Sequence, residues 1–296
     1  MKNGFRVTGV DNSEVAQDTW KINYRGRFVL ADLSDEALGG HYDVVVGGPP
    51  CKPWSAINTT KRGKSHDDYD LLSRFFLHVE KSLPRIFILE NVPPLGKDPQ
   101  LIEHLRILGA KNYSVSTKVL MYGDFGAPTR RHRFFVFGIR NGNASKFIET
   151  LSRRARESAT VKDAIWKLRH VQRGEAPDHD WPELRTISKY RKFYKTGKYG
   201  WYALKWNEPA PSFGNVMKTY ILHPDAFNGG ATRVISVREA LNIMGFGERF
   251  RFPKGIGLGS RYQMVADAVS PAVSNVLAKS VRALFDGERW AENSSN

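Results

Sequence analysis

Cys51 is the only cysteine of the 296-residue chain, and it stands in the stretch GGPPCKPWS. The two glycines before it allow another group to come close to the backbone, and the three prolines around it restrict the backbone. A lone cysteine is either a small buried hydrophobe or a reactive thiol, because it cannot form an internal disulfide or supply a zinc cluster. The stiff, turn-rich setting favours a thiol held for nucleophilic attack.

A carboxylate in the stretch ILEN could provide the partner chemistry. Glu90 ends an apolar run, where a buried carboxylate is costly unless it has a purpose. A carboxyl group beside a heterocycle can hydrogen-bond or protonate a ring nitrogen, which makes the adjacent carbon susceptible to a thiolate. Arg131 and Arg133, two positions apart on a strand-like segment, could steady the thiolate or hold a ring carbonyl. These residue types predict activation of a pyrimidine ring.

The elements that must position these residues alternate between short apolar runs and amphipathic segments. Strands are expected at 5–11, 27–33, 42–48, 85–91, 113–122 and 133–140, and helices at 13–24 (capped by Asn12 or Ser13), 69–83 and 99–110. Continuous apolar strands separated by helices are typical of a mainly parallel sheet covered on both faces. The sequence therefore predicts a doubly wound α/β domain.

Ligands bind such sheets at the carboxyl ends of the strands. This rule selects Asp11 and Asn12 after the first strand, Asp32 after the second, Cys51 past the third and Glu90 at the tip of the fourth. We expect a thiol and four polar side chains to meet at one edge of the sheet.

The domain organisation follows from shifts in composition. We expect a catalytic α/β domain over residues 1–140 and an insertion over 141–230, rich in Lys, Arg, Trp, Tyr and Gly, whose only clear helix is 160–168. Residues 231–288 return to the catalytic domain with helices at 236–246, where Ser236 and Glu239 fit a capping box, and at 268–285. Residues 289–296 are expected to form a loose tail.

The charge of the chain points to a polyanionic partner. Its 45 Lys and Arg against 30 Asp and Glu give a formal net charge of +15, and the basic stretch 184–202 is threaded with aromatic residues. Basic side chains bind phosphates and aromatic rings stack on bases, so nucleic acid is the expected partner. No stretch approaches the roughly 18 apolar residues of a membrane span, and the first residues lack a secretory signal. A cytoplasmic protein is expected.

Six stretches, in chain order, resemble the motifs of the DNA cytosine-5 methyltransferases, and together they extend over nearly the whole chain. They are PPCKPWS, LENVPPL, APTRRHRFFVFGIR, PAPSFGNV, RVISVREALNIMGF and RYQMVADAVSPAVSNVLA. The resemblance implies the S-adenosylmethionine-dependent methyltransferase fold, with a small target-recognition region at 141–230. It also implies double-stranded DNA as the substrate and S-adenosylmethionine as the cofactor.

The resemblance also implies a role for each motif residue. Cys51 would attack C6 of a cytosine flipped out of the duplex, and Glu90 would bind the N3 atom and amino group of the ring. The activated C5 would then take the methyl group of the cofactor. Arg133 would contact the flipped base, and Arg131 would lie near the nucleophile.

Cofactor and substrate contacts are implied by motif position as well. Asp11 or Asn12 would hold the cofactor ribose and Asp32 the adenine amino group, in agreement with the strand-end rule. The remaining expected cofactor residues are Leu33, Pro50, Asp267 and Ala268, and the expected substrate residues are Pro49, Ser55, Asn91 and Val92. Asn91 is expected to fix the loop through side-chain hydrogen bonds.

The chain departs from the family pattern at several places. Lys52 and Thr129 stand where glutamine is usual, and ADAVSP replaces the usual Gly-Asn-Ala-Val-Pro-Pro. The carboxylate of Asp267 would oppose thiolate formation unless it is paired. The Phe-x-Gly-x-Gly-Gly turn of the family, with its central strand, is absent from the sequence. Without that strand, buried backbone groups of both flanking strands would lack partners, at about 1–3 kcal/mol each.

Three explanations for the absent turn remain open. A second polypeptide supplies the strand and the turn, the sequence begins downstream of its true start, or the chain is a non-catalytic relative that binds DNA or regulates a partner. A tRNA cytosine-5 methyltransferase is a further alternative. It is disfavoured because no Cys-Phe-Thr element follows the central motifs.

Overall fold

A computed structural model gives the structure of the chain. It describes residues 3–33, 39–55, 63–184, 187, 189, 191–196, 201–229 and 232–293. The chain forms two compact units, each built from several segments. The first unit comprises Met1–Val29, Tyr122–Arg131 and Ala155–Lys279, and the second comprises Leu30–Met121, His132–Arg154 and Ser280–Asn296.

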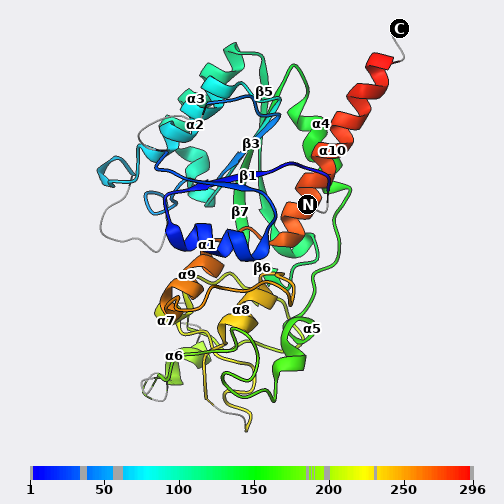
Figure 1. Ribbon diagram of the computed structural model, residues 1–296. Coiled ribbons are helices and arrows are strands. Elements are labelled where there is room, and N and C mark those ends of the chain that lie inside the picture. Colours follow the sequence, from blue (N-terminus) through cyan, green and yellow to red (C-terminus); the bar gives the residue numbers. More distant parts are fainter. Residues whose placement is uncertain are drawn as a thin grey trace. The chain divides into compact units, whose positions relative to one another are not determined.

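Most of the predicted elements are present (Figure 1). The strands are β1 (Thr8–Asp11), β2 (Arg27–Leu30), β3 (Val44–Gly47), β4 (Ile86–Asn91), β5 (Tyr113–Met121), β6 (Thr129–Arg130), β7 (His132–Arg140) and β8 (Ala210–Pro211). The helices are α1 (Glu14–Asn23), α2 (Leu71–Ser82), α3 (Pro99–Ala110), α4 (Ala144–Ser152), α5 (Val161–Ile165), α6 (Arg191–Thr196), α7 (Val216–Thr219), α8 (Val237–Ile243), α9 (Leu258–Asp267) and α10 (Pro271–Asn293). Of the described helices, none has the length and apolar character that a membrane span needs.

The second unit contains a four-stranded sheet in the order β3-β4-β7-β5. Strands β3 and β4 are parallel, whereas β7 runs antiparallel to both β4 and β5. The expectation of a mainly parallel sheet is therefore wrong for this sheet. The reason is that β5 and β7 pair as a hairpin, with Met121 opposite His132, although ten residues lie between them.

Helices cover both faces of this sheet (Figure 1). On one face, Phe87 and Leu89 of β4 pack with Phe76 and Val79 of α2 in the main apolar cluster, which Leu101 and Leu108 of α3 extend. On the other face, the ring of Phe137 in β7 lies 5.4 Å from that of Phe147 in α4. The alternation of side chains along a strand explains this double coverage, which the apolar runs in the sequence predicted.

The edge strand β3 is less covered than its sequence suggests. Its Val46 is 66% exposed, although the run Val44-Val45-Val46 predicts a buried strand. Among the described residues, β3 pairs with β4 alone and β1 pairs with β2 alone, so the sheet is divided into separate pieces.

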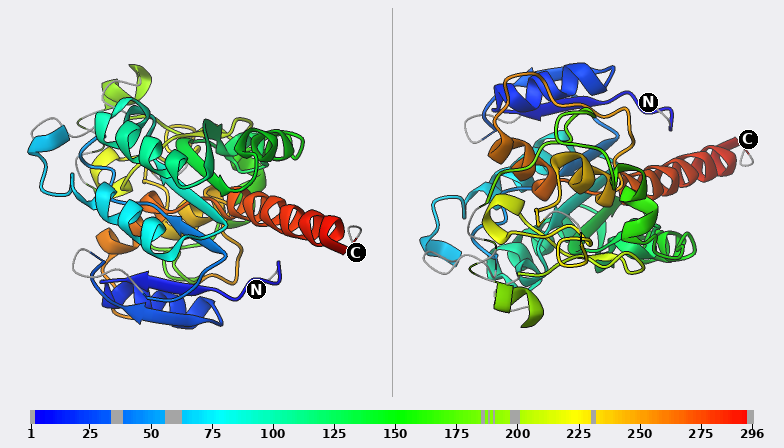
Figure 2. Two further views of the ribbon diagram at one scale, coloured as in Figure 1. Left: turned by 90° about the horizontal axis from the view of Figure 1, so that it is seen from above. Right: turned by 90° about the horizontal axis from the view of Figure 1, so that it is seen from below.

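In the first unit, helix α1 lies along β1 and β2, as both views in Figure 2 show. Ser13 caps α1 by accepting a hydrogen bond from the backbone N–H of Ala16, as predicted. A Cβ atom on Gly9 of β1 would lie 3.0 Å from ring atoms of both Trp20 and Phe28, so glycine lets these rings pack against the strand.

The start of α8 is a buried polar site of the first unit. Ser236 and Glu239 form the predicted capping box, with the Ser236 backbone N–H donating to Glu239 at 2.7 Å. The fully buried Glu239 carboxylate also accepts two hydrogen bonds from Arg233, at 2.7 and 2.8 Å. Burial raises the pKa of Glu239, but the hydrogen bonds and charge of Arg233 outweigh this and leave the pKa below its usual value.

Two predictions about helices are wrong, one about the helices in the insertion and one about the end of the last helix. The insertion contains α4, α6 and α7 in addition to the expected helix, which is split into α5 and a short 3-10 turn at Trp166–Leu168. The expected loose tail is helical as far as Asn293, where α10 ends. Pro271 at the first position of α10 favours helix initiation, and Gly287 alone does not end the helix because good helix formers follow it.

His223 makes the stability of the first unit depend on pH. Burial lowers its pKa to about 4, partly offset by Glu239, whose carboxylate lies 3.7 Å from Nε2. In the unfolded chain this histidine has an ordinary pKa of about 6.5, so between about pH 6.5 and pH 4 the unfolded chain binds more protons than the folded chain. The free energy of unfolding therefore has its full value above about pH 6.5 and falls as the pH drops toward about 4. We expect urea unfolding to show a lower free energy of unfolding at about pH 5 than at about pH 7.

The variant His223→Asn is the matched control for this prediction. Asparagine can keep an acceptor for the backbone N–H of Asp225, which donates to His223 Nδ1 at 3.2 Å, and it removes the titrating group. Its free energy of unfolding should fall less over the same pH range. Equal pH dependence of the two proteins would contradict the prediction.

Candidate active site

Cys51 lies four residues beyond the end of β3 and is half-buried, so its thiol is not enclosed in the apolar core. Strands β3 and β4 are parallel neighbours with Gly47 opposite Leu89. The loop that leaves β3 therefore starts beside the end of β4, where Glu90 stands. The structure places the loop of the thiol beside the strand of the carboxylate within one unit, as the sequence predicted.

Gly47 and Gly48 make room for the side chains at this edge. A Cβ atom on Gly47 would lie 2.5 Å from the ring of Phe75, and one on Gly48 would lie 3.1 Å from Oε2 of Glu90. Both distances are shorter than an ordinary van der Waals contact, and the second one involves the Glu90 carboxylate. The absence of a side chain at residue 48 therefore lets the Glu90 carboxylate lie against the loop of the nucleophile.

The Glu90 carboxylate pairs with Arg133, whose Nε lies 3.0 Å from Oε1. The two side chains are 13% and 16% exposed. Glu90 of β4 lies opposite Phe135 of β7, so Arg133 is its diagonal neighbour on the same face of the sheet. Sequence reasoning selected both residues but did not predict that they pair with each other.

Asn91 fixes the first part of the loop. It is 1% exposed, its amide donates to the carbonyl of Pro49 at 3.0 Å, and its side-chain oxygen accepts from the Val92 backbone N–H at 2.8 Å. These are the contacts of a loop-fixing residue. A contact with substrate stays a prediction for Pro49, Ser55, Asn91 and Val92.

Asp98 holds the second part of the loop, and sequence reasoning missed it. Its carboxylate accepts a hydrogen bond of 2.7 Å from the indole N–H of Trp54, three residues after Cys51. It also caps α3 by accepting from the Gln100 backbone N–H at 2.8 Å. The stretch Asp-Pro-Gln before a helix is a recognisable capping signal, but it does not show that the other carboxylate oxygen reaches the loop.

Arg131 belongs to the first unit and lies between β6 and β7. It is 2% exposed, and its guanidinium donates to the carbonyl of Phe213 at 2.9 Å and to that of Ala266. The described contacts of Arg131 thus join segments of the first unit, whereas Arg133 pairs with Glu90 in the second. Its proposed place near the nucleophile stays a prediction.

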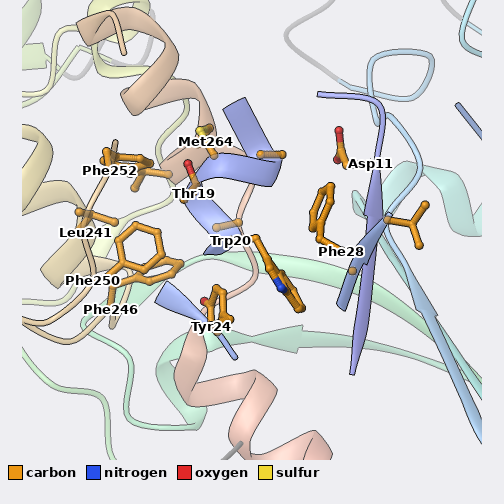
Figure 3. Close-up of a pocket in the computed structure, with 15 residues that line it drawn as sticks. Asp11, Thr19, Trp20, Tyr24, Phe28, Leu241, Phe246, Phe250, Phe252 and Met264 are labelled. Atoms are coloured by element: carbon orange, nitrogen blue, oxygen red, sulfur yellow. The ribbon is translucent and has the colours of Figure 1, made fainter. Parts of the chain in front are cut away.

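The first unit also contains a pocket of about 320 Å³. Two expected cofactor residues, Asp11 and Ala268, line it. Figure 3 shows the rings of Phe246 and Phe250 on one side of this pocket and those of Trp20 and Phe28 on the other. The pocket can accept an apolar or flat group, with the Asp11 carboxylate as an acceptor in its lining.

The structure does not bring the other expected cofactor residues together through any described contact. The carbonyl of Leu33 is hydrogen-bonded to His78 Nε2 at 3.2 Å, and Asn12, Asp32 and Pro50 are exposed. Asp267 is exposed to water and accepts from the Gln263 amide at 2.9 and 3.0 Å. Because Asp11, Asn12, Asp267 and Ala268 belong to the first unit and the other expected site residues, except Arg131, to the second, their meeting at one edge stays a prediction.

The aromatic and basic stretch 184–202 is only partly described, because residues 185–186, 188, 190 and 197–200 lie outside the described residues. Within the described part, the guanidinium of Arg191 lies 5.1 Å from the centre of the Phe227 ring. The Lys192 amine lies 5.4 Å from the centre of the Phe193 ring. Both cations are exposed, so they combine charge with aromatic surface.

Known proteins are similar to this chain in sequence and in fold. Residues 2–283 match the family model described as C-5 cytosine-specific DNA methylase. Type II methyltransferase M1.HphI of Haemophilus parahaemolyticus is 30% identical over 306 residues, which cover 89% of this chain and 77% of that protein.

Two solved structures have a similar fold. The methyltransferase EhMeth of Entamoeba histolytica has a TM-score of 0.69 at 16% identity, over 95% of this chain and 89% of that chain. The Dnmt2 methyltransferase of S. pombe has a TM-score of 0.68 at 14% identity, over 94% and 90%. These likenesses confirm the doubly wound α/β methyltransferase fold. Together with the family match over residues 2–283, they lead to one assignment: the chain belongs to the C-5 cytosine-specific DNA methylase family.

Proposed function

We propose that the chain methylates C5 of cytosine in double-stranded DNA through a covalent bond between Cys51 and C6 of the base. The observation that carries this proposal is the half-buried thiol on a loop packed against Glu90, whose carboxylate is paired with Arg133. A thiol on a loop that lies against a paired carboxylate suits addition to an electron-poor ring, and a buried carboxylate would be costly there without such a use.

The reaction balances in four steps. The Cys51 thiolate adds to C6 and the C5–C6 π electrons move into the ring, while Glu90 binds the amino group and holds a proton at N3. C5 becomes nucleophilic and bonds to the methyl carbon, while the bond from that carbon to the sulfonium sulfur of its donor breaks and the sulfur keeps the electron pair as a neutral thioether. A base then removes the C5 proton, and the S–C6 bond breaks as the double bond forms again. The target base must leave the duplex stack for the thiol to reach its C6.

S-adenosylmethionine would supply an electrophilic methyl group to this reaction. The pocket of the first unit fits the requirements of such a cofactor in part, since Asp11 offers an acceptor for a ribose hydroxyl beside aromatic surface. Asp32, just after β2, would accept from an adenine amino group. Leu33, Pro50, Asp267 and Ala268 complete the proposed contacts.

We also propose that a segment outside residues 1–296, on a second polypeptide or on a longer form of this chain, supplies the absent strand and glycine turn. Two observations support this: β1 and β3 each pair with one strand among the described residues, and Val46 of β3 is 66% exposed. A strand supplied by this segment would satisfy free backbone groups at the edge of the sheet that it joins.

The covalent step is tested with duplex DNA that contains 5-fluorocytosine. Fluorine at C5 cannot leave as the proton does, so the base stays bonded to the enzyme. We expect a denaturation-resistant adduct with the wild-type chain when S-adenosylmethionine and the absent glycine turn are both supplied, and none with Cys51→Ser under the same conditions. Glu90→Gln should slow methyl transfer to normal DNA about 100-fold or more, because it removes a proton-holding group. Gel electrophoresis and mass spectrometry identify the adduct.

The same assay separates the alternatives. It is run with the chain alone and co-expressed with the product of the adjacent upstream reading frame. DNA binding without an adduct under either condition would favour a non-catalytic relative. An adduct on RNA alone would favour the tRNA methyltransferase.

Gly48→Ala should impair catalysis with little other effect. The new Cβ atom would meet Glu90 Oε2 at 3.1 Å and move the carboxylate, and a shift of this kind reduces the rate by roughly 10-fold to 100-fold. Gly39→Ala is the matched control, because nothing lies within 4 Å of its Cβ position. Methyl-transfer rates are measured for both. Equal rates for Gly48→Ala and the wild type would show that the close approach at residue 48 is not needed.

The need for a segment outside residues 1–296 is tested by calorimetry. We expect the isolated chain to bind S-adenosylmethionine weakly or not at all, because the glycine turn that would hold its methionine portion is absent from the sequence. Addition of a polypeptide that carries the strand and a Phe-x-Gly-x-Gly-Gly turn should restore one-to-one binding. Tight one-to-one binding by the isolated monomer would refute the need for this segment and leave the covalent chemistry untouched.

A further inference from the structure

We infer that Asp98 is a positioning residue for the nucleophile, acting through Trp54 and Tyr69 on the part of the loop that follows Cys51. This inference deepens the proposed function, since it names a residue far along the chain that sets the place of the reacting sulfur. All of the residues involved belong to the second unit.

The Asp98 carboxylate is fully engaged. One oxygen accepts the indole N–H of Trp54 at 2.7 Å. The other accepts the phenol O–H of Tyr69 at 3.0 Å and the Gln100 backbone N–H at 2.8 Å. Three donors from three segments thus meet on one side chain, and one of them, Trp54, lies in the described part of the nucleophile loop.

Trp54 connects Asp98 to the cysteine, because its indole bonds to Asp98 and its backbone bonds to Cys51. It is 6% exposed, its ring lies 5.8 Å from that of Tyr69, and its backbone N–H donates to the carbonyl of Cys51 at 3.0 Å. The last bond closes a tight turn that contains Cys51 itself. A shift of the indole would therefore move the backbone of the nucleophile directly.

The hydrogen bonds of this network are costly to break, because the two aromatic donors, Trp54 and Tyr69, are buried. Tyr69 is 7% exposed, and burial together with the hydrogen bond to Asp98 raises its pKa to about 12, so the phenol stays protonated as a donor. A charged acceptor makes stronger hydrogen bonds than a neutral one. Asp98 also stands at the start of α3, where the helix dipole favours a negative charge.

Asp98 and Asn91 together hold both sides of the nucleophile. Asn91 bonds to the carbonyl of Pro49 before Cys51, and Asp98 bonds to Trp54 after it. Both lie on the segment that continues from β4, the strand that carries Glu90. The acid and the two anchors of the thiol are therefore parts of one short stretch of chain, which keeps the distance between sulfur and carboxylate constant.

The test uses the full chain and the variant Asp98→Asn. Asparagine caps a helix as well as aspartate does, so α3 is retained. It offers one acceptor oxygen in place of two and turns an amide N–H₂ toward either Trp54 or Tyr69. Tyr69→Phe removes one donor and keeps the ring, and Trp54→Phe removes the other donor and leaves a smaller aromatic ring. Asp70→Asn is the matched control, since Asp70 is exposed and its side chain makes no capping bond at the start of α2.

The first readout is the exchange of the cytosine C5 hydrogen with deuterated water, which needs no cofactor. Reversible addition of Cys51 to C6 makes C5 take up a deuteron, so the rate reports on the nucleophile. We expect Asp98→Asn and Trp54→Phe to slow exchange by roughly 10-fold to 100-fold, with DNA affinity unchanged within about twofold. The double variant should lose no more than Asp98→Asn alone, because the two residues act through one contact.

The second readout is alkylation of the thiol, which is unambiguous because the chain has one cysteine. Release of the loop should change the alkylation rate of Asp98→Asn severalfold relative to the wild type and to Asp70→Asn, at a temperature where every variant is folded by circular dichroism. Unchanged alkylation, or unchanged exchange alongside a lowered melting temperature, would overturn the inference and leave Asp98 a purely structural cap. If the wild type shows no exchange on DNA, the proposed function fails, and alkylation alone decides the role of Asp98.

Discussion

The ion pair between Glu90 and Arg133 is the interaction on which the site depends. A carboxylate at the end of a buried strand is stable only with a partner, and the antiparallel register of β4 and β7 places Arg133 diagonally across from it. A shift of that register by one residue would turn Arg133 to the opposite face. The sheet of the second unit therefore sets the chemistry, and the glycine at residue 48 lets the loop of the thiol come close to the pair.

Sequence reasoning was most accurate where local signals agreed. Helix α3 spans Pro99–Ala110, the same residues as predicted, because Asp98 and Pro99 mark its start and the apolar pattern ends at Ala110. The capping box of Ser236 and Glu239 was readable for the same reason. Cys51 and Glu90 could be selected because their residue types are unusual in a stiff turn and at the end of an apolar strand.

Features that depend on contacts between residues far apart in the chain could not be predicted from the sequence. The antiparallel direction of β7 follows from its hairpin with β5, and the ten intervening residues hide this connection from any local pattern. The contact between Asp98 and Trp54 joins positions 44 residues apart, and a capping aspartate gives no sign of a second acceptor in use. Likewise, the partner of Glu90 could not be chosen between Arg131 and Arg133 without knowing where β7 begins.

The division of the chain between its units bears on how the protein is made. The polypeptide passes from one unit to the other five times, after Val29, Met121, Arg131, Arg154 and Lys279. Domains that are continuous in sequence can fold one after another as they leave the ribosome. Here the first unit lacks part of its last segment until Lys279 has been synthesised, and the second lacks its last segment until the rest of α10 follows, so native folding of either unit must wait for α10, and no single proteolytic cut can release either unit whole.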